Sequence, residues 1–352
     1  MSRGRSDDGV ATAGKSWPAQ DRLAWARATN RQVADFLDDE PRMAAWAPGT
    51  IANTRNTVGQ FLRWAQTEGL MEVNIRLADI VTPISLLNWI NCQRHRVKLG
   101  TIERKLVLIH AVLQALAADR DWEWIKRIIR RLSLHARREP RPMHPIVHAA
   151  QLYATGLQIM RDSWGSDREP NLSLYRSGLV IALLAAAPMR IGNLAGLRIG
   201  QHLCKNGTQW TIHLDAAETK TRRADTWPIT AQFTPYLDRY LIVIRPMLRQ
   251  RAKPSLDTGH LWIGDSGRPI GDQVLRRIIA TLTRDHLGVR INPHTFRHCA
   301  ATTFALERPH DALQSAALLG HASPETTERH YIIQQRQLVQ HDYLGILAER
   351  RR

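Results

Sequence analysis

The chain has 352 residues, enough for two domains of ordinary size, and 43% of them are apolar, which provides for a core in each. Its 49 lysines and arginines outnumber 32 acidic residues, giving a formal net charge of +17. This excess favours a polyanionic partner, with nucleic acid expected first and an acidic membrane surface as the alternative.

Several classes of protein do not fit the sequence. The longest apolar run, residues 178–189, is too short to cross a bilayer, so no membrane span is expected. The first residues are charged and polar, which predicts no secretory signal and a cytoplasmic, nucleoid-associated protein. Cys92, Cys204 and Cys299 are widely spaced, so neither a disulfide framework nor a thiolate zinc site is expected, and no cofactor is indicated.

The first part of the chain is expected to be all helical. Residues 1–20 lack periodicity and are interpreted as a flexible tail, whereas residues 21–133 are interpreted as a helical DNA-binding domain. Its helices are expected from an N-cap at Thr50 to Glu68, and at about 83–96, 101–118 and 122–132.

A basic, proline-containing linker is predicted at residues 134–144 and taken as the domain boundary. Arg137, Arg138 and Arg141 cannot all be neutralised by Glu139. The segment is therefore either an ordinary surface loop or an extended strap that lies along DNA phosphates.

Residues 145–352 are predicted to form a mostly helical domain with a small antiparallel sheet, so the whole chain is expected to be mainly α. Helices are expected at about 145–162 and 172–187. Trp210, Ile212 and Leu214 alternate along one strand, and the chain returns at about residue 224 after a basic turn, which indicates a hairpin.

The segment HTFRHCAATTF begins at His294, directly after an Asn-Pro pair, and is expected to open a helix with His294 and Arg297 on one face. Unpaired backbone N–H groups in a first turn favour an anion. A core histidine and a surface arginine would explain this segment equally well. His298 has the spacing of a zinc pair with His294, but Thr295 replaces the glutamate of a zinc protease, so no metal is expected.

Farther along, LLGH places His321 on a turn behind Gly320, and a Ser-Pro-Glu start signal predicts a helix that carries Tyr331. A lone tyrosine is usually a half-buried core residue. The neighbouring motifs make a chemical role the better interpretation here.

In their order and spacing, HTFRH, LLGH and the HY pair ending at Tyr331 resemble the C-terminal signature of the tyrosine recombinase family, the phage integrase type. Upstream, APMRIGNLAGL around Arg190 resembles the family's first-arginine box. Lys220 falls on the predicted hairpin turn, where these enzymes keep a lysine. The resemblance is close over residues 143–331 and looser over 21–132, the counterpart of the family's core-binding domain.

The chain departs from the family pattern at three places. Asn193 stands where an acidic residue is usual, Pro188-Met189 where Gly-Leu is common, and Cys299 where a serine is usual. Asn193 supplies no carboxylate to fix Arg190 through a bidentate ion pair, which leaves the catalytic efficiency open.

The resemblance implies a metal- and ATP-independent cleavage in which Tyr331 attacks a phosphodiester and forms a 3′-phosphotyrosyl bond. Arg190 and Arg297 would clamp the charged transition state, since guanidinium forks suit phosphate oxygens. His321 would donate to a non-bridging oxygen. His294 would assist proton transfer from the tyrosine.

The departing 5′-oxygen needs a proton, and the resemblance assigns this donor to Lys220, with Lys205 as the competitor. A 5′-hydroxyl from another strand could then reverse the step. Two alternatives remain: a type IB topoisomerase with the same cage, and a sequence-specific DNA-binding protein with an inactive site.

The expected partner is double-stranded DNA at specific sites, contacted in part by Arg222 and Arg223 of the basic turn. The family works as a tetramer in synapsis, with a monomer or dimer in the unbound form, and accessory DNA-bending or directionality proteins are possible partners. A helix at about 338–347 is expected to dock either on a neighbouring protomer or on its own domain. The sequence leaves open whether the role is phage integration, transposition, or integron or chromosome resolution.

Overall fold

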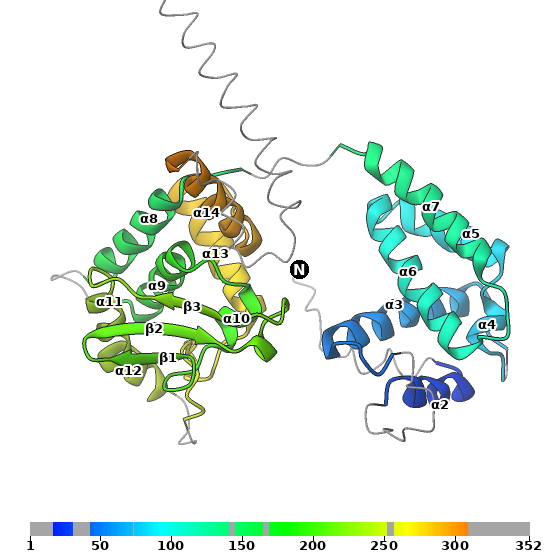
Figure 1. Ribbon diagram of the computed structural model, residues 1–352, viewed down its shortest axis with the longest axis horizontal. Coiled ribbons are helices and arrows are strands. Elements are labelled where there is room, and N and C mark those ends of the chain that lie inside the picture. The colour runs from blue at the N-terminus through cyan, green and yellow to red at the C-terminus, as the bar shows by residue number, and fades with distance from the viewer. Residues whose placement is uncertain are drawn as a thin grey trace, which may run out of the picture. The chain divides into compact units, whose positions relative to one another are not determined.

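The structure is a computed structural model that describes residues 17–30, 43–72, 74–140, 145–164, 169–251 and 257–308. The chain divides into two compact units, Met1–Pro142 and Met143–Arg352, which are described separately below (Figure 1). Arg141, His321, Tyr331 and the helix predicted at 338–347 lie outside the described residues. Within the described ranges, no helix is long and apolar enough to span a bilayer.

The described part of the first unit is helical throughout, as predicted. Its core includes the fully buried Phe61 and Trp89, which meet edge to face with ring centroids 5.5 Å apart. Figure 1 shows α7 running along α6. The helices are α2 (Ala19–Ala28), α3 (Pro48–Thr67), α4 (Leu77–Ile80), α5 (Pro83–Arg94), α6 (Leu99–Leu116) and α7 (Glu123–Arg138).

The start of this unit differs from the prediction in two places. Trp17 is buried and packs 5.1 Å from Trp25, and α2 begins at Ala19, so the last residues of the predicted tail are folded. Helix α3 begins at Pro48, which means that Thr50 lies in its first turn and is not the N-cap. Proline is favourable there because the first helical turn does not need its missing N–H.

The segment predicted as an extended linker is partly helical, because α7 continues to Arg138 instead of ending at Leu132. Ile128, Ile129 and Leu132 pack against the core of the first unit and keep the helix in place, and no proline occurs between Glu123 and Pro140. Arg137 and Arg138 are therefore exposed residues of the last turn of α7.

The second unit has a helical core beside a three-stranded antiparallel sheet of order β1-β2-β3. Its central helix is the almost entirely buried α9. The helices are α8 (Ala149–Asp162), α9 (Leu172–Ala186), α10 (Ile191–Gly196), α11 (Thr234–Arg239), α12 (Arg245–Arg249), α13 (Asp272–Leu287) and α14 (Pro293–Glu307), with a 3-10 turn η1 (Ala216–Glu218) and a π turn η2 (Tyr240–Ile244). The strands are β1 (Leu203–Asn206), β2 (Gln209–Leu214) and β3 (Asp225–Pro228).

The predicted hairpin is confirmed as β2 and β3, which pair with Ile212 opposite Trp227. The sequence did not indicate β1, because only Leu203 of this short strand is buried and no alternation develops. The connection from β2 to β3 contains η1 and the basic turn, so Lys220 lies between the two strands in the chain.

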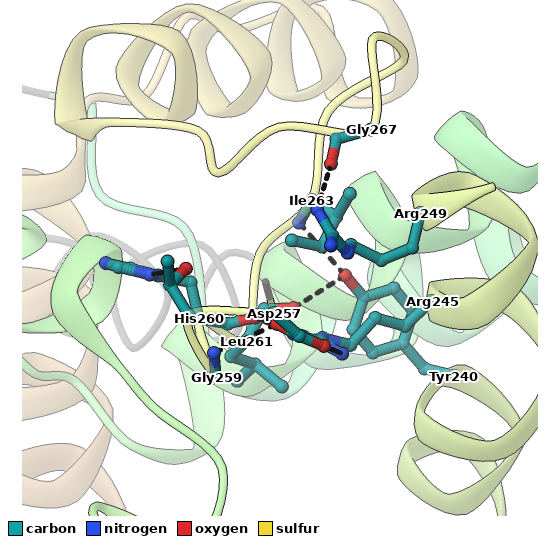
Figure 2. A network of polar contacts seen from close by, with 10 residues as sticks. Tyr240, Arg245, Arg249, Asp257, Gly259, His260, Leu261, Ile263 and Gly267 are labelled. Carbon is teal, nitrogen blue, oxygen red and sulfur yellow. Dashed lines mark hydrogen bonds and ion pairs between the residues drawn. The ribbon is translucent and has the colours of Figure 1, made fainter. Parts of the chain in front are cut away.

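A polar network fastens the segment after residue 257 to η2 and α12 (Figure 2). The buried Arg245 pairs with both carboxylate oxygens of Asp257 at 2.7 and 2.8 Å and also donates to the carbonyl of His260. The hydroxyl of Tyr240 donates to the carbonyl of Leu261 at 2.8 Å. This arrangement fixes Trp262, whose Nε1 donates to the carbonyl of Leu194 in α10 at 2.7 Å.

Candidate functional site

A pocket of about 710 Å³ in the second unit brings together residues from distant parts of the chain. It contains four of the six predicted catalytic residues, and none of the described residues that line it carries a carboxylate. The lining is formed by Arg190, Ile191, Lys220, Thr221, Arg222, Arg276, Pro293, His294 and Arg297. This concentration of cations suits a phosphate group.

Arg297 is fixed most firmly. It is only 6% exposed, and its guanidinium donates to the backbone carbonyl of Pro188. Its helix, α14, begins at the predicted place, where the side chain of Asn292 accepts a hydrogen bond from the N–H of Thr295 at 3.0 Å. Burial, and then the charge of Arg190, lowers the pKa of Arg297 to about 10, so it remains a cation at neutral pH.

Arg190 is half-buried and forms the N-cap of α10, with extended backbone angles. The neighbouring Met189 and Ile191 are buried, and the hydrogen bond from Trp262 holds α10 from behind. Arg297 donates to the carbonyl of Pro188, two residues before Arg190. This hydrogen bond therefore links Arg297 to the backbone segment that carries Arg190.

His294 is exposed in the first turn of α14. Its Nε2 lies 3.1 Å from Nε2 of His298, one turn farther along, and the ring centroids are 4.5 Å apart. In such a contact one nitrogen donates and the other accepts, so the tautomers of the two rings depend on each other.

Lys220 is exposed and reaches the pocket from the loop between η1 and β3. The competitor, Lys205, does not line the pocket. Its Nζ lies 3.2 Å from the carboxylate of Asp238 and 5.3 Å from the ring of Trp210.

Sequence reasoning missed Arg276 and Thr221. Arg276 lies on α13 and pairs with Asp272 one turn earlier at 3.4 Å, which in sequence reads as an ordinary charged helix face. Only the packing of α13 in the fold brings Arg276 to the pocket. The buried Oγ1 of Thr221 has no hydrogen-bond partner among the described residues.

The predicted DNA-contact residues are spread over the chain. Arg222 lines the pocket, in a left-handed backbone conformation with φ of 52°. Arg223 is exposed on the same loop but does not line the pocket, and Arg137 and Arg138 are exposed on α7 of the first unit.

Comparisons with known proteins find relatives over much of the chain. Residues 166–337 match the model of the phage integrase family. The chain is 31% identical over 162 residues to "Tyrosine recombinase XerC" of Thermodesulfovibrio yellowstonii, covering 46% of this chain and 51% of that protein. It is 28% identical over 315 residues to the protein of the same name from Methylobacterium sp. strain 4-46, covering 88% and 90%.

Among solved structures, the chain resembles the XerH site-specific recombinase bound to its difH substrate in a pre-cleavage complex. The TM-score is 0.58 at 15% identity, with 91% of this chain and 93% of that one covered. A post-cleavage complex of XerH gives the same TM-score. The motifs agree with these matches: residues 166–337 carry a domain of the phage integrase family, and the chain as a whole is similar to tyrosine recombinases.

Proposed function

We propose that this protein cuts and rejoins DNA at specific sites through a 3′-phosphotyrosyl intermediate on Tyr331, without a metal ion or ATP. The observation that carries the proposal is the pocket in which Arg190, Lys220, His294 and Arg297 meet, although they come from three separate regions of the chain. Cations from the protein can supply the charge stabilisation for which other nucleases use metal ions.

Arg190 and Arg297 bind the non-bridging oxygens of the scissile phosphate and stabilise the extra negative charge of the transition state. His321, which lies outside the described residues, adds a hydrogen bond to one of these oxygens. Buried guanidinium groups suit this task because they stay charged and need no reorganisation during the reaction. None of the described lining residues carries a carboxylate, and outside the lining Asp272 forms an ion pair with Arg276, so the positive potential is neutralised only in part.

In the cleavage step, the bond between Tyr331 Oη and phosphorus forms while the bond between phosphorus and the 5′-oxygen breaks. His294 accepts the proton of the tyrosine, which at a typical pKa of about 10 is a poor nucleophile. Lys220 gives a proton to the leaving 5′-oxygen. Rejoining reverses each transfer, so the phosphodiester energy is conserved in the phosphotyrosyl bond.

Helix α7 supports the proposed binding of double-stranded DNA. It exposes a set of arginines that form a surface for phosphates: Arg127, Arg130, Arg131, Arg137 and Arg138. Glu123 is the one acidic residue of α7. It lies in the first turn of the helix and pairs with Lys126 and Arg130. We further propose a homotetramer on two paired sites, since strand exchange requires a second DNA partner.

A nicked substrate that loses a short fragment after cleavage tests the chemistry. It should trap a covalent protein–DNA adduct in the presence of EDTA, and Tyr331→Phe should abolish that adduct. An adduct on Tyr331→Phe would reject the nucleophile. Relaxation of supercoiled DNA without any recombination site would point to topoisomerase activity instead, and specific binding without any adduct would point to an inactive DNA-binding protein.

A further inference from the structure

We propose that His202, Glu218 and Asn193 are positioning residues that hold Lys220 in place for proton transfer to the 5′-oxygen. None of the three lines the pocket. The inference rests on the proposed function, in which Lys220 is the proton donor.

The loop that carries Lys220 has a shape set by its own residues. Thr219 is 4% exposed, and its hydroxyl donates to the carbonyl of Arg223 at 2.7 Å and accepts from the N–H of Arg223 at 3.1 Å. These bonds close the turn over residues 220–222 but do not attach it to the rest of the unit. The loop runs directly into β3, which pairs with β2, and on the side of η1 it is attached by Glu218, two residues before Lys220.

Glu218 is tied to the sheet through His202. Its Oε1 lies 2.9 Å from Nε2 of His202, a side chain that is almost buried beside β1. Nδ1 of His202 accepts the backbone N–H of Arg198 at 3.0 Å, so the proton of a neutral ring is on Nε2 and points to Glu218. The other carboxylate oxygen accepts the N–H of Asp215 at 3.1 Å.

The carboxylate of Glu218 therefore has a partner for each oxygen. The hydrogen bond from His202 also lowers the pKa of Glu218, which keeps it ionised at neutral pH. A charged acceptor makes a stronger bond than a neutral one, so this contact can fix the start of an otherwise exposed loop.

Asn193 links Glu218 to α10, the helix that begins next to Arg190. Its Nδ2 lies 3.4 Å from the backbone carbonyl of Glu218, and Asn193 follows Arg190 by one helical turn on α10. A carboxylate at position 193, as is usual in the family, has no proton to donate and would face this carbonyl oxygen. The amide is thus suited to the loop of this chain, which connects Arg190 to Lys220 through Glu218.

The test uses the full-length protein and compares two DNA substrates, one with the natural 5′-oxygen and one with a bridging sulfur in its place. A thiolate leaves without a proton, so cleavage of the sulfur substrate does not need Lys220. We expect Glu218→Gln and Asn193→Asp to slow cleavage of the oxygen substrate by about 10-fold, a part of what a general acid contributes.

The same variants should cleave the sulfur substrate at close to the wild-type rate, which also shows that they are folded. Lys220→Ala should also cleave the sulfur substrate at close to the wild-type rate, and its cleavage of the oxygen substrate should be slowed more than in the other variants. Glu169→Gln, at an exposed carboxylate of the same unit, should cleave both substrates normally.

Equal slowing on both substrates by Glu218→Gln and Asn193→Asp would show a general structural role and overturn the proposal, as would no slowing on either. If the sulfur substrate restores the cleavage rate of Lys220→Ala but not that of Glu218→Gln, the positioning proposal fails and the proton-donor assignment stands. If sulfur does not restore Lys220→Ala, the proton-donor assignment fails and the positioning proposal fails with it.

Discussion

The two sides of the pocket are built differently. Arg297 is buried and bonded to the backbone before Arg190, and α10 is held from behind by Trp262. Lys220, by contrast, is exposed on a loop that depends on a few hydrogen bonds of Thr219 and Glu218. The comparison suggests a division of work. The side of Arg190 and Arg297, the rigid side, would bind the phosphate charge. The side of Lys220, the adjustable side, is exposed and held by few hydrogen bonds and would transfer the proton.

The largest expected effect is on the rigid side. Arg297→Ala should lower the single-turnover cleavage rate by about 10³-fold or more, because it removes a preorganised cation from the transition state. Arg297→Lys should recover little, since an ammonium group cannot form the same fork. DNA affinity, measured by gel shift, should stay within a few-fold; complete loss of binding would make Arg297 a phosphate anchor only.

On the adjustable side, Lys220→Ala should slow cleavage by about 10²-fold, the lower range for loss of a general acid. Lys205→Ala is the matched control and should cleave at the wild-type rate, because Lys205 is paired with Asp238 away from the pocket. A larger defect in Lys205→Ala than in Lys220→Ala would exchange their roles.

The rigid side also predicts a dependence of stability on acid pH. Arg245 holds the pKa of Asp257 at about 2, below its ordinary value of 3.8. The folded pKa is depressed, so the stabilisation is present above about pH 4 and is lost as the pH falls toward 2. Since Asp257 is 44% exposed, solvent screening limits the effect to about 1 kcal/mol.

Chemical unfolding at pH 7 and pH 3 measures this contribution. The difference in unfolding free energy between wild type and Asp257→Asn should shrink at the lower pH. A difference that does not change with pH would mean that the Arg245 pair contributes nothing through its charge.

The smallest effect should come from α7, far from the chemistry in the chain. Arg127→Gln with Arg131→Gln should reduce the salt dependence of DNA binding, with the slope of log affinity against log salt falling by about two. Cleavage at saturating DNA should be unchanged. Lys126→Gln, which removes a lysine paired with Glu123, should change the slope less.

The sequence predicted those parts of the molecule that have local signals. The start of α14 follows from an N-cap and a proline, and the β2–β3 hairpin follows from alternation. The four described catalytic candidates came from motifs. The end of α7 was missed because packing of Ile128 and Ile129 continues the helix into a segment that looks like a linker.

Other features have no local signal. Arg276 reaches the pocket only through tertiary packing, and the bond between His202 and Glu218 joins residues sixteen positions apart that belong to no motif. Judged against the family pattern, Asn193 replaces a carboxylate that could have formed an ion pair with Arg190. Its amide bond to the Glu218 carbonyl gives the substitution a structural reason.

The carboxylate-free lining of the pocket also affects folding. Five cationic side chains repel one another there, and burial already lowers the pKa of Arg297. A bound phosphate diester would reduce this repulsion, so DNA that binds the folded state should raise the unfolding free energy of the second unit.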